Sequence, residues 1–153
     1  MTKRTKALMP GLIKPQLATL KDSAPLSAQW IREIKYHAYR VQVHVDRGAA
    51  KIFTRNGHDW IHRFSYIAGS FRLPSRTIFD SEVVVVHEGR TNFSELQADL
   101  ATGRQDRMLF CAFDILHHNG EDLRGKPQLY RKERLKELID MLPADPLQRA
   151  PRW

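Results

Sequence analysis

Residues 39–54 read YRVQVHVDRGAAKIFT, and this stretch decides the class of fold. Val41, Val43 and Val45 alternate with polar residues, which is the period of a strand with one buried face. The turn signal Asp46-Arg47-Gly48 follows, and Ala50–Thr54 supplies the returning strand. The stretch therefore predicts an antiparallel β-hairpin.

Further elements are predicted on both sides of the hairpin. Asn92 and Glu95 have capping-box spacing ahead of a helix that ends at Gly103. Other apolar patterns predict strands over 30–36, 77–87 and 108–116, a short helix within 58–70, and a last helix that stops before Pro143. We expect an α+β fold with a mainly antiparallel sheet flanked by short helices.

Length and composition fit one domain, or a piece of a larger one, at 153 residues. The single cysteine, Cys111, excludes a disulfide within the monomer and favours a reducing compartment. The longest aliphatic run, Val83–Val86, is far shorter than a membrane helix requires. No apolar stretch follows the basic N-terminus, so a secretory signal is not expected. We expect a cytoplasmic protein with no membrane partner.

The charge balance favours a polyanionic partner. Lys and Arg number 25 against 17 Asp and Glu, which gives a net charge of +8. Such a surplus attracts nucleic acids, because each cation near a phosphate releases condensed counterions. Much of the surplus comes early, at Lys3, Arg4, Lys6, Lys14 and Lys21.

The composition divides the chain into three parts. Residues 1–28 are rich in Pro, Lys and small residues and predict an N-terminal arm, which could pack through Leu17, Ala18 and Leu20. Residues 29–143 carry the strand and helix patterns and form the predicted domain. Residues 144–153 are expected to be a C-terminal tail.

The octapeptide EIKYHAYR, residues 33–40, is the most informative site candidate. Lys35 follows apolar Ile34 and precedes the cation Arg40, and both desolvation and a nearby cation favour the neutral amine that a nucleophile requires. The alternative is a strand-edge lysine that prevents aggregation.

This octapeptide resembles the nucleotidyl-transferase motif of ATP-dependent DNA ligases, Glu-x-Lys-x-Asp-Gly-x-Arg. Further segments match that family in order. They are residues 15–20 (PQLATL), 53–57 (FTRNG), 80–84 (DSEVV), 113–116 (FDIL), and 119–124 (NGEDLR) with 131–135 (RKERL). The chain is thus similar to the N-terminal part of an adenylation domain of ATP-grasp-like fold, closest to bacterial end-joining ligases, and is truncated relative to that domain.

The resemblance implies an ATP site. Lys35 would attack the α-phosphate of ATP and form a lysyl-AMP intermediate for sealing breaks in DNA. Glu33 would lie beside adenine and Phe113 would stack on it, although Phe113 could equally be a core residue.

Three more residues complete the implied site. Arg40 and Arg55 would contact ribose and phosphate oxygens, while Arg55 beside a turn could simply be solvated. Glu82 would meet the ribose hydroxyl or a Mg²⁺ ion. His58, His62, His117 and His118 lack zinc-like spacing to other ligands and are expected to be surface or core residues.

The sequence departs from the family pattern at three points. His37-Ala38 replaces Asp-Gly after the nucleophile, and Ala costs more than Gly wherever φ is positive. Ser81 replaces a glycine and could crowd the nucleotide. The family's later Glu-Gly-x-x-Lys and Lys-x-Lys strands are absent from this sequence, so weak or no activity is expected alone, unless a second chain supplies them. A catalytically dead module that binds nucleic acid or a partner is the alternative.

Overall fold

The computed structural model describes residues 8–31, 33, 36–142 and 145–149. Within these residues a seven-stranded sheet has the order β2-β1-β3-β5-β6, with β4 paired to β3 and β7 paired to β5. The strands are β1 (Tyr39–Asp46), β2 (Ala49–Thr54), β3 (Arg76–His87), β4 (Arg90–Thr91), β5 (Met108–His118), β6 (Glu121–Asp122) and β7 (Leu147–Arg149). All pairings are antiparallel except that of β5 with β7. The predicted fold class is confirmed.

The hairpin of β1 and β2 forms as the sequence predicts. Asp46 pairs with Ala49, so the loop is Arg47-Gly48, and both loop residues have positive φ. This geometry matches the right-handed twist of the two strands. Val41, Val43 and Val45 are buried and join the core. The other face of β1 therefore presents Arg40, Gln42 and His44.

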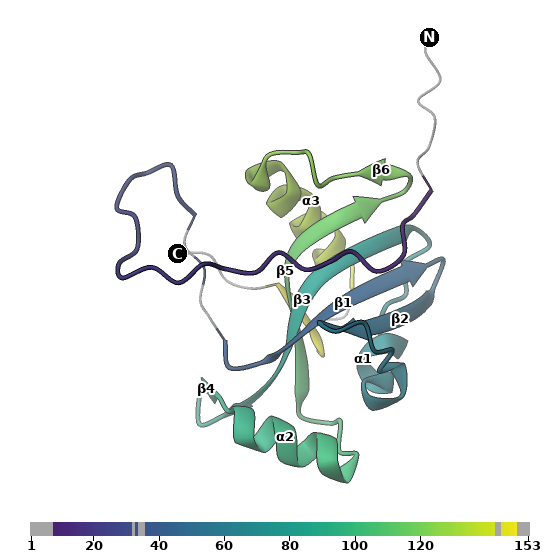
Figure 1. The fold of residues 1–153 in the computed structure, drawn as a ribbon. Helices are drawn as coiled ribbons and strands as arrows, with labels where there is room; N and C mark the ends of the chain where they lie inside the picture. Colours follow the sequence, from purple (N-terminus) through teal and green to yellow (C-terminus); the bar gives the residue numbers. More distant parts are fainter. Residues whose placement is uncertain (1–7, 32, 34–35, 143–144, 150–153) are drawn as a thin grey trace.

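Four short helical elements accompany the sheet in the part of the chain that the structure describes: η1 (Ile61–Arg63), α1 (Ser65–Gly69), α2 (Phe93–Thr102) and α3 (Gln128–Asp140), of which the three α-helices are labelled in Figure 1. The helix expected within 58–70 is divided in two at Phe64, whose φ is −125°. The cap of α2 is confirmed, because the Asn92 side chain accepts a hydrogen bond from the Glu95 amide and Gly103 has a left-handed φ of 76°.

The strand predicted over 30–36 is wrong for the described residues of that segment. Trp30 is 62% exposed, and among residues 30, 31, 33 and 36 only Glu33 makes a β-bridge. The physical reason is the absence of a free edge on β1, which already pairs with β2 on one side and β3 on the other. Lys35 lies outside the described residues.

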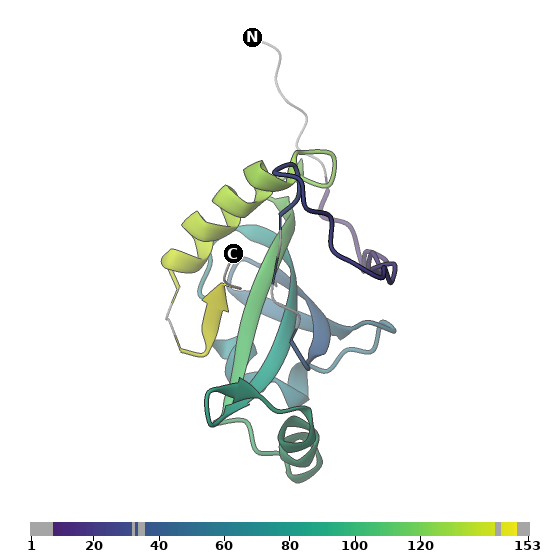
Figure 2. The ribbon, with the colours of Figure 1, turned by 90° about the vertical axis from the view of Figure 1, so that its left-hand side faces the viewer.

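Residues 8–20, called the arm below, run across the polar face of the sheet (Figure 1). Figure 2 shows the arm and helix α3 on opposite sides of the curved sheet. The arm does not pack through Leu17 and Leu20 as expected, since both side chains are exposed. β7 lies within the segment predicted as a tail and extends the sheet at β5. None of the described helices is long and apolar enough to cross a membrane.

Candidate functional site

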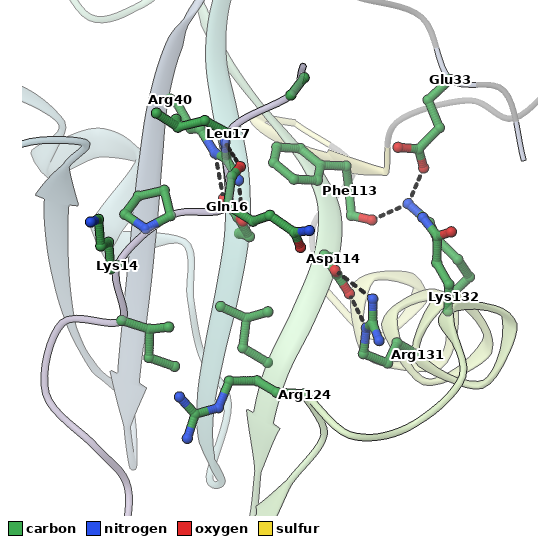
Figure 3. A pocket seen from close by; sticks show the side chains of 16 residues that line it. Lys14, Gln16, Leu17, Glu33, Arg40, Phe113, Asp114, Arg124, Arg131 and Lys132 are labelled. Carbon is green, nitrogen blue, oxygen red and sulfur yellow. Dashed lines mark hydrogen bonds and ion pairs between the residues drawn. The ribbon is translucent and has the colours of Figure 1, made fainter. Parts of the chain in front are cut away.

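A cleft of about 630 Å³ is lined by residues of the arm, β1, β3, β5, α3 and the segment of Glu33 (Figure 3). Its described lining carries five cationic and three acidic side chains together with Phe113 and apolar arm residues. The charged members are Lys14, Arg40, Arg124, Arg131, Lys132, Glu33, Asp80 and Asp114. The excess of positive charge suits an anionic ligand.

Arg40, from the first residues of β1, contacts three parts of this cleft. Its Nε and Nη2 donate to the two carboxylate oxygens of Asp80 at 3.1 and 2.7 Å, and its Nη1 donates to the Gln16 carbonyl at 2.7 Å. The guanidinium also lies 5.4 Å from the centre of the Phe113 ring. The hydrogen bond to Asp80 raises the pKa of Arg40 above its usual range, so the side chain stays charged.

Lys132, from the inner face of α3, joins two further segments. Its ammonium donates to the Glu33 carboxylate and to the Phe113 carbonyl (Figure 3). The side chain is only 5% exposed, and a buried charge is tolerated because it is paired and hydrogen-bonded. Lys132 therefore fixes Glu33 beside β5.

Arg131 and Asp114 form a second forked ion pair at the mouth of the cleft. Arg131 Nε and Nη2 donate to the two Asp114 oxygens at 2.8 and 3.2 Å, and Nη1 donates to the Lys126 carbonyl. Asp114 directly follows Phe113, so this pair holds α3 against the strand that carries the aromatic ring.

Three of the residues predicted from the sequence come together. Glu33, Arg40 and Phe113 come from distant segments and all line the cleft. Arg55 is exposed in the turn after β2 and is not among the lining residues.

Glu82 does not line the cleft either, and it is half-buried on β3. Its pairing partners are Arg40 on β1 and Cys111 on β5. Burial, with a contribution from Glu82, raises the pKa of the Cys111 thiol to about 11. Burial also raises the pKa of Tyr36, with Cys111 and Glu82 adding to the effect. Glu82 thus lies close to the residue that follows Lys35.

Two departures from the family pattern cost less than expected. Neither His37 nor Ala38 has a positive φ, so alanine carries no left-handed strain here. The Ser81 side chain is buried and donates to the Val41 carbonyl at 2.9 Å. Its hydroxyl is therefore held by the backbone of β1, and Ser81 is not among the residues that line the cleft.

Sequence reasoning missed the partners that hold the site together, chiefly Asp80, Asp114 and Lys132. Lys132 lies three and seven positions before Leu135 and Ile139, on the buried stripe of α3. A lysine on such a stripe signals a specific buried partner. The position of Lys132 could therefore have predicted a buried partner, but the sequence does not show that this partner is Glu33.

The described residues contain no group of three His, Cys, Asp or Glu side chains arranged to hold a metal ion. In the cleft, Glu33, Asp80 and Asp114 each already pair with a cation. His58 and His62 are exposed, while His117 is buried. The described part of the chain thus shows no preformed all-protein cage for a metal ion.

Comparison with known proteins matches residues 15–149 to the model of a family described as the ATP dependent DNA ligase domain. The chain is 36% identical over 145 residues to the multifunctional non-homologous end joining protein LigD of Pseudomonas aeruginosa, covering 93% of this chain and 17% of that protein. It is 30% identical over 146 residues to the bifunctional non-homologous end joining protein LigD of Bacillus subtilis, covering 83% of this chain and 24% of that protein.

Solved structures agree with these relatives. The ligase domain of M. tuberculosis LigD superposes with a TM-score of 0.76 at 29% identity, over 90% of this chain and 45% of that one. A mycobacterial DNA ligase D complexed with ATP and MES gives a TM-score of 0.65 at 26% identity, over 80% of this chain and 39% of that one. The chain thus spans about a quarter or less of the length of these curated relatives.

Proposed function

The chain belongs to the ATP-dependent DNA ligase domain family, and we propose that it forms the nucleotide-binding part of an adenylation domain in end-joining DNA repair. One observation carries this proposal. Glu33, Arg40 and Phe113, which the ligase-like motifs single out in three separate segments, line the same cleft. A core phenylalanine and two solvated charges would have no reason to converge in this way.

Phe113 and the charges around it suit a nucleoside triphosphate. The aromatic ring offers a face for stacking a base, and Lys132 holds Glu33 next to it. Lys14 and Arg124 add positive charge along the lining, where phosphate oxygens need neutralisation. Arg55 and Glu82, outside the cleft lining, stay proposed ligands for phosphate and for ribose or Mg²⁺.

Lys35 is the proposed nucleophile. Its neutral amine attacks the α-phosphorus of ATP, and a phosphorus–nitrogen bond forms as the bond to the bridging oxygen breaks. Pyrophosphate leaves with the bonding electrons, and the nitrogen loses a proton to solvent. The AMP group then passes to the 5′-phosphate at a DNA break, and the 3′-hydroxyl displaces it.

Labelling with ATP tests the proposal. Incubation of the chain with α-³²P-labelled ATP and Mg²⁺ is expected to give a covalent label, because the α-phosphate stays on the nucleophile as a lysyl-AMP adduct. Lys35→Arg should abolish the label, since a guanidinium stays protonated and cannot attack.

The matched control is Lys21→Arg, which changes an exposed lysine outside the cleft lining and should leave the label unchanged. A label of equal strength in the Lys35→Arg variant would contradict the assignment of the nucleophile.

A second candidate function is a ligase-like module that binds nucleic acid or a partner without catalysis. The self-paired charges of the cleft favour it, because Arg40 already donates through Nε, Nη1 and Nη2 to the protein itself. With the net charge of +8, this candidate predicts DNA binding that weakens about tenfold or more between 50 and 200 mM salt. Such binding without covalent label would favour it over adenylation.

A further inference from the structure

The arm follows β1 closely and in the opposite direction. Leu12 lies against Gly57, where a Cβ would come within 3.0 Å of the Leu12 side chain and where φ is +86°. Ile13 then meets Gln42, and Gln16 meets Arg40. The order of these contacts sets the position of the arm along the strand.

Gln42 makes the central contact of this series. Its side chain is 3% exposed, its Oε1 accepts from the Ile13 amide at 2.9 Å, and its Nε2 donates to the Ile13 carbonyl at 2.9 Å. Both backbone groups of one arm residue are thus bonded, as they would be by a neighbouring strand. The arm gains a single ladder-like pairing without forming a strand.

His44 adds a second contact to this pairing. Its Nε2 is hydrogen-bonded to the same Gln42 Oε1 at 2.7 Å, so the oxygen that accepts from the arm also contacts the imidazole. The Ile13 amide and carbonyl fix which end of the Gln42 amide is the oxygen, because exchange would set one N–H against another. His44 is itself buried and contacts the Phe53 ring edge-on at 5.1 Å between centroids. The Gln42 side chain that holds Ile13 is therefore itself held in place by a buried neighbour.

Burial of apolar side chains does little to hold the arm. Leu8, Leu17 and Leu20 are exposed, so the contacts to Gln42, Arg40 and Gly57 are the main restraints on it. A segment held by few contacts opens locally at low cost when one of them is removed.

Ile13, which Gln42 holds, and the residues that follow it through Ala18 form one wall of the cleft. We propose that Gln42 is a positioning residue for ATP, which fixes these wall residues opposite Phe113 without touching the nucleotide. This inference rests on the proposed function of the cleft. Gln42 itself is not among the lining residues, so its effect passes through the arm.

Two variants test the role of Gln42. Gln42→Met removes both hydrogen bonds to Ile13 at nearly constant volume. Ile13→Pro removes the amide donor from the arm side and leaves the sheet untouched, so it remains informative if the first variant fails to fold. Because the Ile13 side chain also lines the cleft, Ile13→Val, which keeps the amide donor, is its control and should bind the analogue as the unmodified chain does. The matched control is Gln105→Met, because Gln105 also hydrogen-bonds a backbone amide, Tyr66, but lies away from the arm.

Two quantities are measured. Calorimetry gives the dissociation constant for the non-cleavable analogue α,β-methylene-ATP with Mg²⁺, and hydrogen exchange gives the rates at which the backbone amides of residues 12–18 exchange. We expect both test variants to bind the analogue about tenfold more weakly and to exchange these amides faster, with Gln105→Met unchanged in both.

The outcomes separate the two proposals. Unchanged affinity in Gln42→Met and Ile13→Pro, alongside binding by the unmodified chain, would overturn the positioning role alone. A comparable loss of affinity in Gln105→Met would also overturn it, by assigning the effect to general destabilisation. Absence of binding by the unmodified chain would contradict the proposed function of the cleft, and the role of Gln42 toward ATP with it.

Discussion

Single residues of the site act mainly by holding one another. Arg40 shows this most clearly, since it joins β1 to Asp80 on β3 and to Gln16 in the arm, and lies over the Phe113 ring. A ligand that takes one of its donors must replace the bond to the Gln16 carbonyl, because the forked pair with Asp80 is partly buried and costly to break. At this scale, the proposed role of Arg40 as an ATP ligand requires that its Nη1 give up the Gln16 carbonyl.

His44 gives the residue-scale prediction on pH. Burial, with Lys51 and His117 adding, lowers its pKa to about 4 from the usual 6.5. The unfolded chain therefore binds the proton more readily than the folded chain, and stability falls as pH drops through this window. We expect His44 to account for a loss of about 2 kcal/mol in unfolding free energy between pH 7 and pH 5.

Urea unfolding at the two pH values measures this loss. The His44→Gln variant should show a pH-dependent loss smaller by that amount, whereas His62→Gln, at an exposed position, should behave as the unmodified chain does. An equal pH dependence in all three proteins would contradict the assignment.

At the scale of elements, α2 shows how a local signal fixes a boundary. Asn92 Oδ1 accepts from the Glu95 amide at 3.0 Å, which satisfies one of the free amides of the first turn. Asn92→Ala is expected to lower the unfolding free energy by about 1 kcal/mol, as measured by urea denaturation. Gln97→Ala, on the exposed face of the same helix, should change it by no more than a few tenths of a kcal/mol. Equal losses in both variants would argue against the cap.

Elements whose signals are local were predicted well, and those that depend on distant partners were not. The hairpin, α2 and the long strands follow from alternation, turns and caps within a few residues. The segment 30–36 has the alternation of a strand, but β1 pairs with β2 and with β3 and so offers it no free edge. β7 is three residues long and pairs with a strand more than thirty positions earlier, which no local period reveals.

The helix expected within 58–70 illustrates an intermediate case. Its apolar spacing is right, since Phe64 and Ile67 are buried in the core. However, the Trp60 amide donates to the Ile52 carbonyl of β2, which ties the start of the segment to the sheet. The segment therefore turns twice, as η1 and α1, in place of one continuous helix.

The whole molecule brings the site together from separate parts of the chain. The arm, the segment of Glu33, β1, β3, β5 and α3 all contribute lining residues, so the motifs could indicate Glu33, Arg40 and Phe113 but not Lys132, which connects two of them. The positive surplus of the sequence is repeated in the cleft, where cations outnumber acids. Family membership and cleft geometry thus point to the same ligand class at the largest scale.

The central claim, that this cleft directs ATP to residue 35, is tested most directly by locating the adduct. The chain is incubated with ATP and Mg²⁺, digested under conditions that preserve the phosphorus–nitrogen bond, and mapped by peptide mass spectrometry. The account predicts AMP on Lys35 and on no other lysine, at a low occupancy that falls further in Phe113→Ala as stacking is lost. AMP on Lys132 or on an exposed lysine such as Lys21, with none on Lys35, would contradict it.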